Sequence, residues 1–264
     1  MTTLAILGAA GRMGRMLVRC AAEIPGARVT AAIEQPGHAM LGQDAGTLAG
    51  LPASGLLLTD AWPGRETAAA VVDFTFHAAT AANLRNAVAN KQAVVLGTTG
   101  HSDAEKSIIR DAANHIPIVY AANFSFGVNL LLDLVQRAAA ALDPAYDVEI
   151  IETHHRLKKD APSGTALALA QSVANGRRGN LNDLATYGRH GIVGERPAGE
   201  IGIHAVRGGD VVGDHTVLFA ALGERVEITH KASSRDCFAN GALRAALWVS
   251  GKEAGLYDMR DVIR

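Results

Sequence analysis

The N-terminal stretch LAILGAAGRMGRMLVRCAAE, followed by ARVTAAIE, restricts the fold more than any other part of the sequence. It starts as an apolar run typical of a buried strand, turns at closely spaced glycines, and continues with apolar residues at helical spacing. The second stretch has the pattern of another strand. Strand, helix and strand within residues 4–34 have the length of one right-handed crossover, which predicts a parallel sheet.

The same alternation continues to about residue 125. It predicts further strands in AAVVDFT, QAVVLGTTG and PIVYAANFS, with helices near residues 78–89 and 103–114. Alternating strands and helices are typical of an α/β fold in which helices cover both faces of a parallel sheet. We therefore expect a Rossmann-type domain of the kind that binds dinucleotides.

The pattern changes in the second half of the chain. A long apolar helix near residues 127–142 precedes strands in YDVEIIETHH, GIHAVRG, HTVLFAA and RVEITHKA, and the last two are predicted to form a hairpin through residues 222–224. This is typical of an α+β domain with a mixed sheet. We expect the glycine-rich residues 176–202 to form a mobile loop, and the helical C-terminal segment to pack back on the first domain. The predicted domains are residues 1–126 with 236–264, and residues 127–235.

Charge and cysteine content exclude several classes of protein. The formal net charge is −1, which does not favour nucleic acid or an anionic membrane as a partner. No apolar run reaches the ~18 residues of a membrane span, and a first strand at Leu4 leaves no room for a leader. Cys20 and Cys237 are far apart and have neither metal-ligand nor redox spacing. We expect a cytoplasmic protein whose two thiols are free and packed.

The glycine turn GAAGRMG resembles a dinucleotide-binding fingerprint with altered spacing. Gly8, Gly11 and Gly14 follow G-x-x-G-x-x-G, so that Ala9 takes the place of the first glycine of G-x-G-x-x-G. Gly11 would let the backbone approach a pyrophosphate, Gly14 would let the helix lie close to the sheet, and amides of the helix start would donate to the anion. A turn that needs glycine for packing alone is the alternative. The predicted cofactor turn comprises Gly8, Ala9, Ala10, Gly11, Arg12 and Met13.

An acidic residue ends the second strand, where a dinucleotide fold binds the adenosine ribose. Glu34 lies twenty positions beyond Gly14, and a solvated surface glutamate is the alternative. Neutral Gln35 follows it, where an enzyme that prefers the 2′-phosphate could place a cation. NADH is therefore favoured over NADPH. Arg12 could contact a pyrophosphate or a 2′-phosphate, or be solvated.

Two later loops follow predicted strands, where parallel sheets form their binding crevice. They are GTTG, residues 97–100, and AANFSFG, residues 121–127. Both could also be ordinary turns and core. The residues expected on the nicotinamide side are Gly97, Thr98, Thr99, Ala121, Ala122, Asn123 and Phe124.

The segment ETHHRLKKD concentrates cations in an almost neutral chain. If its strand continues past the histidines, His154, Arg156 and Lys158 share one face and His155 lies on the other. Histidines that point apart make a poor metal pair, and no carboxylate or thiolate completes a site, so we expect no metal. Histidine exchanges a proton near neutral pH, and a desolvated lysine can do so as well. The segment therefore favours acid–base and anion chemistry.

A helix start follows the cations directly in APSGTALALA. Ser163 is the candidate N-cap, and Gly164 and Thr165 open the helix with exposed amides and a hydroxyl that suit a carboxylate. The alternative is a basic surface loop before a capped helix. A separate dinucleotide domain in the same chain favours a site for an anionic substrate.

The motifs GAAGRMGR, DFT, GTTG, AANFSFGVN, ETHHRLKKDAPSGTA, HAVRGGDVVGDH and THKASSR together resemble the 4-hydroxy-tetrahydrodipicolinate reductase family, also called dihydrodipicolinate reductases. The resemblance extends from Leu4 to the GLYDMRDV tail. It implies NAD(P)H-dependent reduction of 4-hydroxy-tetrahydrodipicolinate to tetrahydrodipicolinate with loss of water, in the diaminopimelate route to lysine.

The resemblance also implies roles for individual residues. His154 would be the proton donor and acceptor and Lys158 the second proton donor, while His155, Gly164 and Thr165 would hold the substrate. The glycine turn, Glu34 and the two later loops would bind the dinucleotide.

The family further implies a homotetramer formed through the sheet of the second domain, with hinges near residues 125–127 and 234–236. Members that use NADPH readily often have arginine after the ribose acid, so Gln35 argues against a strong NADPH preference. Two other functions stay open from the residues. Another two-domain dehydrogenase would keep the glycine turn but should lack H-H-x-x-K followed by S-G-T, and a dinucleotide sensor should lose His154 and Lys158.

Overall fold

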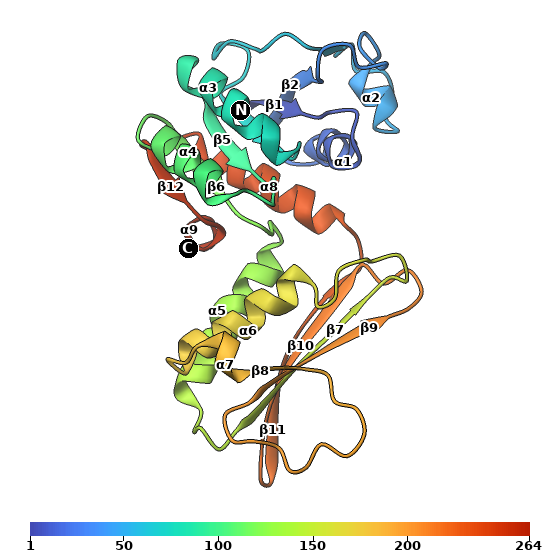
Figure 1. The fold of residues 1–264 in the computed structure, drawn as a ribbon. Coiled ribbons are helices and arrows are strands. Elements are labelled where there is room, and N and C mark those ends of the chain that lie inside the picture. The colour runs from blue at the N-terminus through green and yellow to red at the C-terminus, as the bar shows by residue number, and fades with distance from the viewer. The chain divides into compact units, whose positions relative to one another are not determined.

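The computed structural model describes all 264 residues, and its internal contacts divide the chain into two compact units. The first unit comprises residues Met1–Phe126 and Asp236–Arg264, and the second comprises Gly127–Arg235. Figure 1 shows both units with their elements labelled.

The first unit contains a seven-stranded sheet in the order β12-β6-β5-β4-β1-β2-β3, in which every pair of neighbours is parallel. The chain runs from β1 through β2 to β3 on one side, then crosses to β4, β5 and β6 on the other. This confirms the predicted Rossmann-type sheet. The two-residue β3 and the three-residue β12 were not predicted, because such short strands have no readable alternation. The strands are β1 (Thr2–Leu7), β2 (Ala27–Ile33), β3 (Leu58–Thr59), β4 (Ala70–Asp73), β5 (Ala93–Leu96), β6 (Pro117–Tyr120) and β12 (Gly255–Tyr257).

Helices cover both faces of this sheet and form a separate apolar core on each (Figure 1). Leu4 and Val72 pack with Leu17 of α1 and Leu243 of α8, whereas residues of the opposite strand face pack with α3 and α4. The continuous burial of β4 and β5 follows from this double cover. The helices of this unit are α1 (Arg12–Ala21), α2 (Ala45–Leu48), α3 (His77–Ala89), α4 (Asp103–Ala113), α8 (Asp236–Val249) and α9 (Met259–Ile263).

The second unit is built on a five-stranded sheet in the order β11-β10-β7-β9-β8. Strands β7, β9 and β8 are parallel, while β10 is antiparallel to both β7 and β11, so the sheet is mixed as expected. The predicted hairpin is present, since Ala221 pairs with Glu224 across a two-residue loop. The elements are α5 (Phe126–Ala141), β7 (Asp147–His154), α6 (Gly164–Gly176), α7 (Leu181–Leu184), β8 (Ala185–Tyr187), β9 (Ile201–Arg207), β10 (Gly213–Ala221) and β11 (Glu224–Ala232).

One face of strand β7 joins the core of this unit. Val148 and Ile150 are fully buried and pack with apolar residues of α5 and α6, and the alternation continues to Glu152 and His154 at the end of the strand. A carboxylate and an imidazole therefore continue an apolar face.

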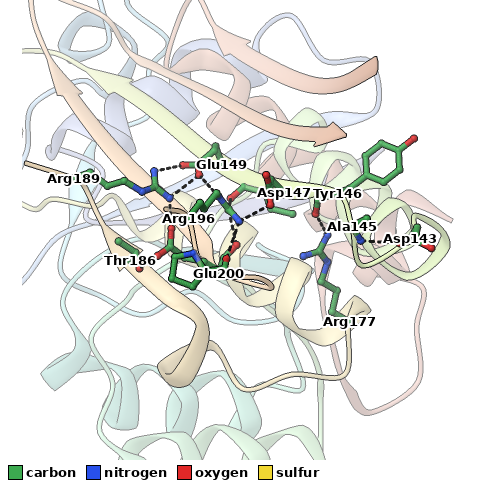
Figure 2. Close-up of polar contacts among 12 residues, drawn as sticks. Asp143, Ala145, Tyr146, Asp147, Glu149, Arg177, Thr186, Arg189, Arg196 and Glu200 are labelled. Atoms are coloured by element: carbon green, nitrogen blue, oxygen red, sulfur yellow. Dashed lines mark hydrogen bonds and ion pairs between the residues drawn. The ribbon is translucent and has the colours of Figure 1, made fainter. Parts of the chain in front are cut away.

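The prediction of a loop over residues 176–202 is wrong for part of this segment. This segment contains α7 and β8, and an ion-pair network anchors the rest to β7, as Figure 2 shows. Arg189 donates to both Glu149 and Glu200, and Arg196 donates to Glu149 and Asp147 at 3.0 and 2.8 Å. Glycine content predicted the turns, but it could not reveal side-chain partners that lie forty positions away in the sequence.

Candidate active site

A crevice of about 700 Å³ opens in the first unit at the carboxyl ends of the strands. It lies where the order of the sheet reverses between β1 and β4, which is where open parallel sheets bind their ligands. Gly8, Gly11 and Glu34 line it, together with Phe74 and Thr75 beyond β4. With Ala10, which also lines the crevice, four predicted cofactor positions therefore lie on one cavity.

The glycine turn has the close backbone packing that its sequence predicts. Gly8 has a φ of +66°, which L side chains rarely adopt, and the N–H of Gly11 donates to the carbonyl of Gly8 at 2.9 Å. A Cβ on Gly14 would lie only 2.1 Å from that carbonyl oxygen. Gly14 thus lets the backbone of α1 lie directly against the backbone of Gly8 and Ala9 in the turn. Helix α1 begins at Arg12, immediately after Gly11 of the turn.

Glu34 closes the turn from the second strand. Its carboxylate accepts from the N–H of Ala10 at 2.9 Å and from the N–H of Gln35 at 3.3 Å. The side chain is half-buried and lines the crevice, whereas Arg12 is exposed. The structure therefore brings Glu34 and the turn together, as a ribose acid beside a pyrophosphate loop requires.

A buried carboxylate that the sequence analysis did not single out organises the loops beyond β4 and β5. Asp73 is 1% exposed and accepts from the amide of Thr75 at 2.8 Å, from Asn83 at 2.8 Å and from the Thr98 hydroxyl at 3.3 Å. The Thr98 hydroxyl is thus turned inward, while Thr99 is exposed. Asp73 is the acid of the DFT motif, and its place at the end of a buried strand was the available signal.

The two predicted nicotinamide-side loops meet at one aromatic ring. A Cβ on Gly97 would lie 2.2 Å from the ring of Phe74, so the GTTG loop needs glycine there. Phe124 of the second loop is buried and packs edge to face on Phe74, with 5.4 Å between centroids. In the same loop Asn123 accepts from the amide of Ser125 at 2.8 Å, and Ala121 and Ala122 are partly exposed.

In the second unit, β7 ends at a buried histidine. His154 is 8% exposed, and its Nδ1 lies 2.5 Å from Oε2 of Glu152, which is fully buried. The guanidinium of Arg207 donates to both oxygens of that carboxylate, at 2.8 and 2.7 Å. The amide of Ser163 donates to Oε1 at 3.0 Å. A buried carboxylate is stable here because it is both paired and hydrogen-bonded.

Burial sets the proton affinities of this cluster. It lowers the pKa of His154, while the hydrogen bond to Glu152 raises it and the nearby charges of Lys158 and Arg207 lower it further. For Glu152, burial alone would raise the pKa, but hydrogen bonds from Arg207 and His154 outweigh it and lower the pKa. The pKa of His215 falls to about 4 through burial, so this second imidazole stays neutral near pH 7.

Lys158 reaches the cluster in a way the sequence pattern did not predict. The strand does not continue past the histidines, since β7 ends at His154 and the amide of Lys158 donates to the carbonyl of His155 within a turn. The alternation that placed Lys158 on the face of His154 is therefore wrong. Its ammonium pairs with Asp160 at 2.9 Å and acts on His154 through its charge.

The helix start after the cations is capped as predicted. The Ser163 hydroxyl accepts from the amide of Ala166 at 3.1 Å, and its oxygen also lies 3.1 Å from Nε2 of His215. Gly164 is exposed with open space where a Cβ would be, and Thr165 is half-buried. His155 is half-buried, and its Nε2 lies 3.3 Å from Arg235. A capped helix that begins with an exposed glycine suits a carboxylate.

Comparison with known proteins agrees with this arrangement. The family model described as Dihydrodipicolinate reductase, N-terminus, matches residues 2–124, and that described as Dihydrodipicolinate reductase, C-terminus, matches residues 127–263. A 4-hydroxy-tetrahydrodipicolinate reductase of Anaeromyxobacter sp. (strain Fw109-5) is 50% identical over 264 residues, covering 100% of this chain and 98% of its own. The chain belongs to the dihydrodipicolinate reductase family.

Solved structures extend the likeness to the fold. A dipicolinate-bound dihydrodipicolinate reductase from Paenisporosarcina sp. TG-14 has a TM-score of 0.74 and 26% identity, over 98% of this chain and 97% of that one. An amine dehydrogenase from Mycobacterium smegmatis has a TM-score of 0.59 at 10% identity, covering 97% and 94% of the two chains, and shares the fold alone. Membership of the dihydrodipicolinate reductase family makes the chain an oxidoreductase with a dinucleotide-binding domain.

Four residues around His154 in this family member were not singled out from the sequence. Glu152 and His154 lie on the same face of β7, and the period-two pattern VxIxExH was the signal for that pair. Arg207, Gly213 and His215 come from β9 and β10, at least 53 positions from His154, and only the sheet register brings them near.

Two features are absent from the structure. No group of three or more His, Cys, Asp or Glu side chains is arranged to hold a metal ion. No helix is both long enough and apolar enough to cross a membrane.

Proposed function

We propose that this chain catalyses the NAD(P)H-dependent reduction of 4-hydroxy-tetrahydrodipicolinate to tetrahydrodipicolinate with loss of water, in lysine biosynthesis through diaminopimelate. The observation that carries the proposal is the buried His154, held through one ring nitrogen beside the capped start of α6. It combines a group that exchanges protons with a site for carboxylate. Full-length similarity to a 4-hydroxy-tetrahydrodipicolinate reductase supports the substrate.

The first unit would hold the dinucleotide, which supplies hydride when bound. Gly8 to Met13 would contact the pyrophosphate and Glu34 the ribose, which the position of Gly8, Gly11 and Glu34 on the crevice supports. The loops Gly97 to Thr99 and Ala121 to Phe124 would lie on the nicotinamide side. Phe74 packs against both loops and keeps them together.

The second unit would hold the cyclic dicarboxylate. The α6 amides at Gly164 and Thr165, with His155 and Lys158, offer hydrogen-bond donors and positive charge to its carboxylates. His154 would exchange the proton that accompanies reduction, and Lys158 would act as the second donor. The dipicolinate in the related structure is itself a cyclic dicarboxylate.

Cofactor preference follows from the end of β2. Glu34 accepts from two backbone amides and presents a negative charge where NADPH has its 2′-phosphate, and exposed Gln35 adds no cation. We therefore propose that NADH is the better reductant and that NADPH is also used, because exposed Arg12 remains near the turn.

Assembly and location are carried over from the family. We propose a cytoplasmic homotetramer formed through the sheet of the second unit. The crossings of the chain between units, near residues 125–127 and 234–236, are the proposed hinges of closure over substrate.

The function is tested by following nicotinamide oxidation by the purified protein, with NADH and NADPH in parallel. Substrate is generated in place by the synthase from pyruvate and aspartate semialdehyde, and samples without synthase are the control. We expect oxidation that depends on the synthase and is faster with NADH. Absence of oxidation with either cofactor, given a proven supply of substrate, would contradict the reductase function and favour another dehydrogenase or a dinucleotide sensor.

A further inference from the structure

We propose that Glu152 is the positioning residue of the site, and that it fixes the proton of His154 on Nδ1 while tying the histidine to the helix start that receives substrate carboxylate. The inference rests on the proposed function, because it assumes that His154 exchanges a proton during reduction. It concerns a residue that the substrate does not touch, since Glu152 is fully buried.

Both oxygens of Glu152 are fully engaged. Oε2 accepts from His154 at 2.5 Å and from Arg207 at 2.8 Å, and Oε1 accepts from Arg207 at 2.7 Å and from the amide of Ser163 at 3.0 Å. An ionised carboxylate can only accept hydrogen bonds, and four donors occupy its lone pairs. Each donor fixes the carboxylate in one rotamer, and the fixed carboxylate in turn fixes the plane of the imidazole.

The same contacts join three segments of the proposed site. Ser163 is the N-cap of α6, so its amide connects Glu152 to the start of that helix. Arg207 also donates to the carbonyl of Asp160 at 2.7 Å, and Asp160 pairs with Lys158. A single buried carboxylate therefore holds the histidine, the lysine turn and the helix start in register. Positioning at this precision is what proton transfer requires.

The tautomer of His154 follows from this geometry. Because the neighbouring carboxylate accepts, Nδ1 must carry the hydrogen, and a neutral imidazole then has its lone pair on Nε2. Nε2 lies beside Gly213, where a Cβ would come within 2.9 Å, so the absence of a side chain there leaves this nitrogen uncovered. The other groups facing the ring are Lys158, Arg207 from β9 and His215 from β10.

A buried ion pair can also serve the fold alone, so the test needs a readout that a structural role would not move. We compare Glu152→Gln with Glu149→Gln, which makes the same change on the same strand at a carboxylate that also pairs with arginine and histidine. Glutamine keeps the size but removes the charge.

For Glu152→Gln we expect kcat to fall roughly 10- to 100-fold with little change in KM, as for residues that orient a reacting histidine. Since Glu152 raises the pKa of His154, the limb of the pH profile due to this histidine should move to lower pH. Glu149→Gln should leave kcat and the profile unchanged.

A second measurement does not depend on whether the variant folds. Long-range proton–nitrogen correlation spectra of the ¹⁵N-histidine-labelled wild-type protein, assigned with His154→Gln, report which nitrogen of His154 carries hydrogen. We expect the Nδ1-protonated form near pH 7. An Nε2-protonated His154, or a folded Glu152→Gln with unaltered kcat and pH profile, would overturn the inference. An inactive wild-type protein with Nδ1-protonated His154 would instead contradict the proposed function and leave the positioning intact.

Discussion

Strand β7 carries two carboxylates with the same kinds of partner on opposite faces. Glu149 binds Arg189, Arg196 and His204, and Glu152 binds Arg207 and His154. Composition does not distinguish the two clusters. What differs is the position of the histidine, since His154 ends β7 beside the capped start of α6, whereas His204 lies within β9.

The Glu149 cluster joins strand β7 to the segment between β8 and β9. Arg189 and Arg196 come from the segment between β8 and β9, and their guanidiniums reach Glu149 and Glu200 as Figure 2 shows. A Cβ on Gly202 of β9 would lie 1.9 Å from the Glu149 carboxylate, so a larger residue there would displace this carboxylate from its partners. Hydrogen bonds from Arg189, His204 and Arg196 lower the pKa of Glu149 to about 2, against burial that alone would raise it. This cluster therefore anchors residues 188–200 to β7.

The Glu152 cluster continues the core face of β7 and ends beside the start of α6. His154 uses only Nδ1 for Glu152, and the capped helix beside it begins with the exposed Gly164. The proposed function gives a role to a partner of Glu152 and none to the partners of Glu149, although the pKa of both carboxylates is lowered, so a shifted pKa does not by itself mark a site. Four variants probe this contrast, from the largest expected effect to the smallest.

His154→Gln should lower kcat by about 100-fold or more, because general acid–base catalysis contributes 10²–10⁴-fold. The affinity for NADH, measured by calorimetry, should be unchanged, since the proposed cofactor residues lie in the first unit. Turnover at the wild-type level would remove His154 from its proposed role.

Gly213→Ala should lower kcat roughly 10-fold by placing a methyl group 2.9 Å from Nε2 of His154, a cost of about 1.4 kcal/mol in the transition state. Gly202→Ala is the matched control, because it crowds Glu149 instead. We expect this control to lower stability and keep kcat. Equal losses of kcat in the two variants would erase the distinction between the clusters.

Glu149→Gln should lower the free energy of unfolding by roughly 1–3 kcal/mol at pH 7, because three donors lose a charged acceptor. The pKa of Glu149 is depressed in the folded chain to about 2, so its contribution is complete above the unfolded pKa of about 4.3 and disappears as the pH falls toward 2. Urea unfolding at several pH values measures the difference from wild type. A difference that stays constant down to pH 2 would exclude the Glu149 charge as its source.

His204→Gln should have the smallest effect. It removes one of several donors to Glu149 at a side chain that is 32% exposed, so we expect a loss of stability within about 1 kcal/mol and no change in kcat. Steady-state assays of His204→Gln and His154→Gln under the same conditions compare their kcat values. A fall in turnover of more than about 10-fold would show that the Glu149 cluster also supports the reaction.

The sequence predicted best those features that depend on residues close together in the chain. The crossover from β1 to β2, the glycine turn and the N-cap at Ser163 depend on nearby residues, and each could be predicted from spacing. Roles for His154 and Glu34 could be proposed from family motifs. The strand ends that carry these two residues could be predicted from the same local patterns.

The remainder depended on contacts between distant segments. Arg207 reaches Glu152 across 55 positions, through the parallel register of β7 and β9. Arg189 and Arg196 reach Glu149 across 40 and 47 positions, so the ion pairs that hold residues 188–200 to β7 could not be predicted. Lys158 was misplaced because a turn replaced the expected continuation of the strand. No local pattern encodes such partners.

The central claim is that the Glu152 face of β7 binds the ligand and the Glu149 face does not. It is tested most directly by titrating dipicolinate, the cyclic dicarboxylate bound in the related reductase, into ¹⁵N-histidine-labelled protein with NADH present. The account predicts that the imidazole signals of His154 and His155 move with added dipicolinate while those of His204 stay in place. Movement of His204 without movement of His154 and His155 would contradict it.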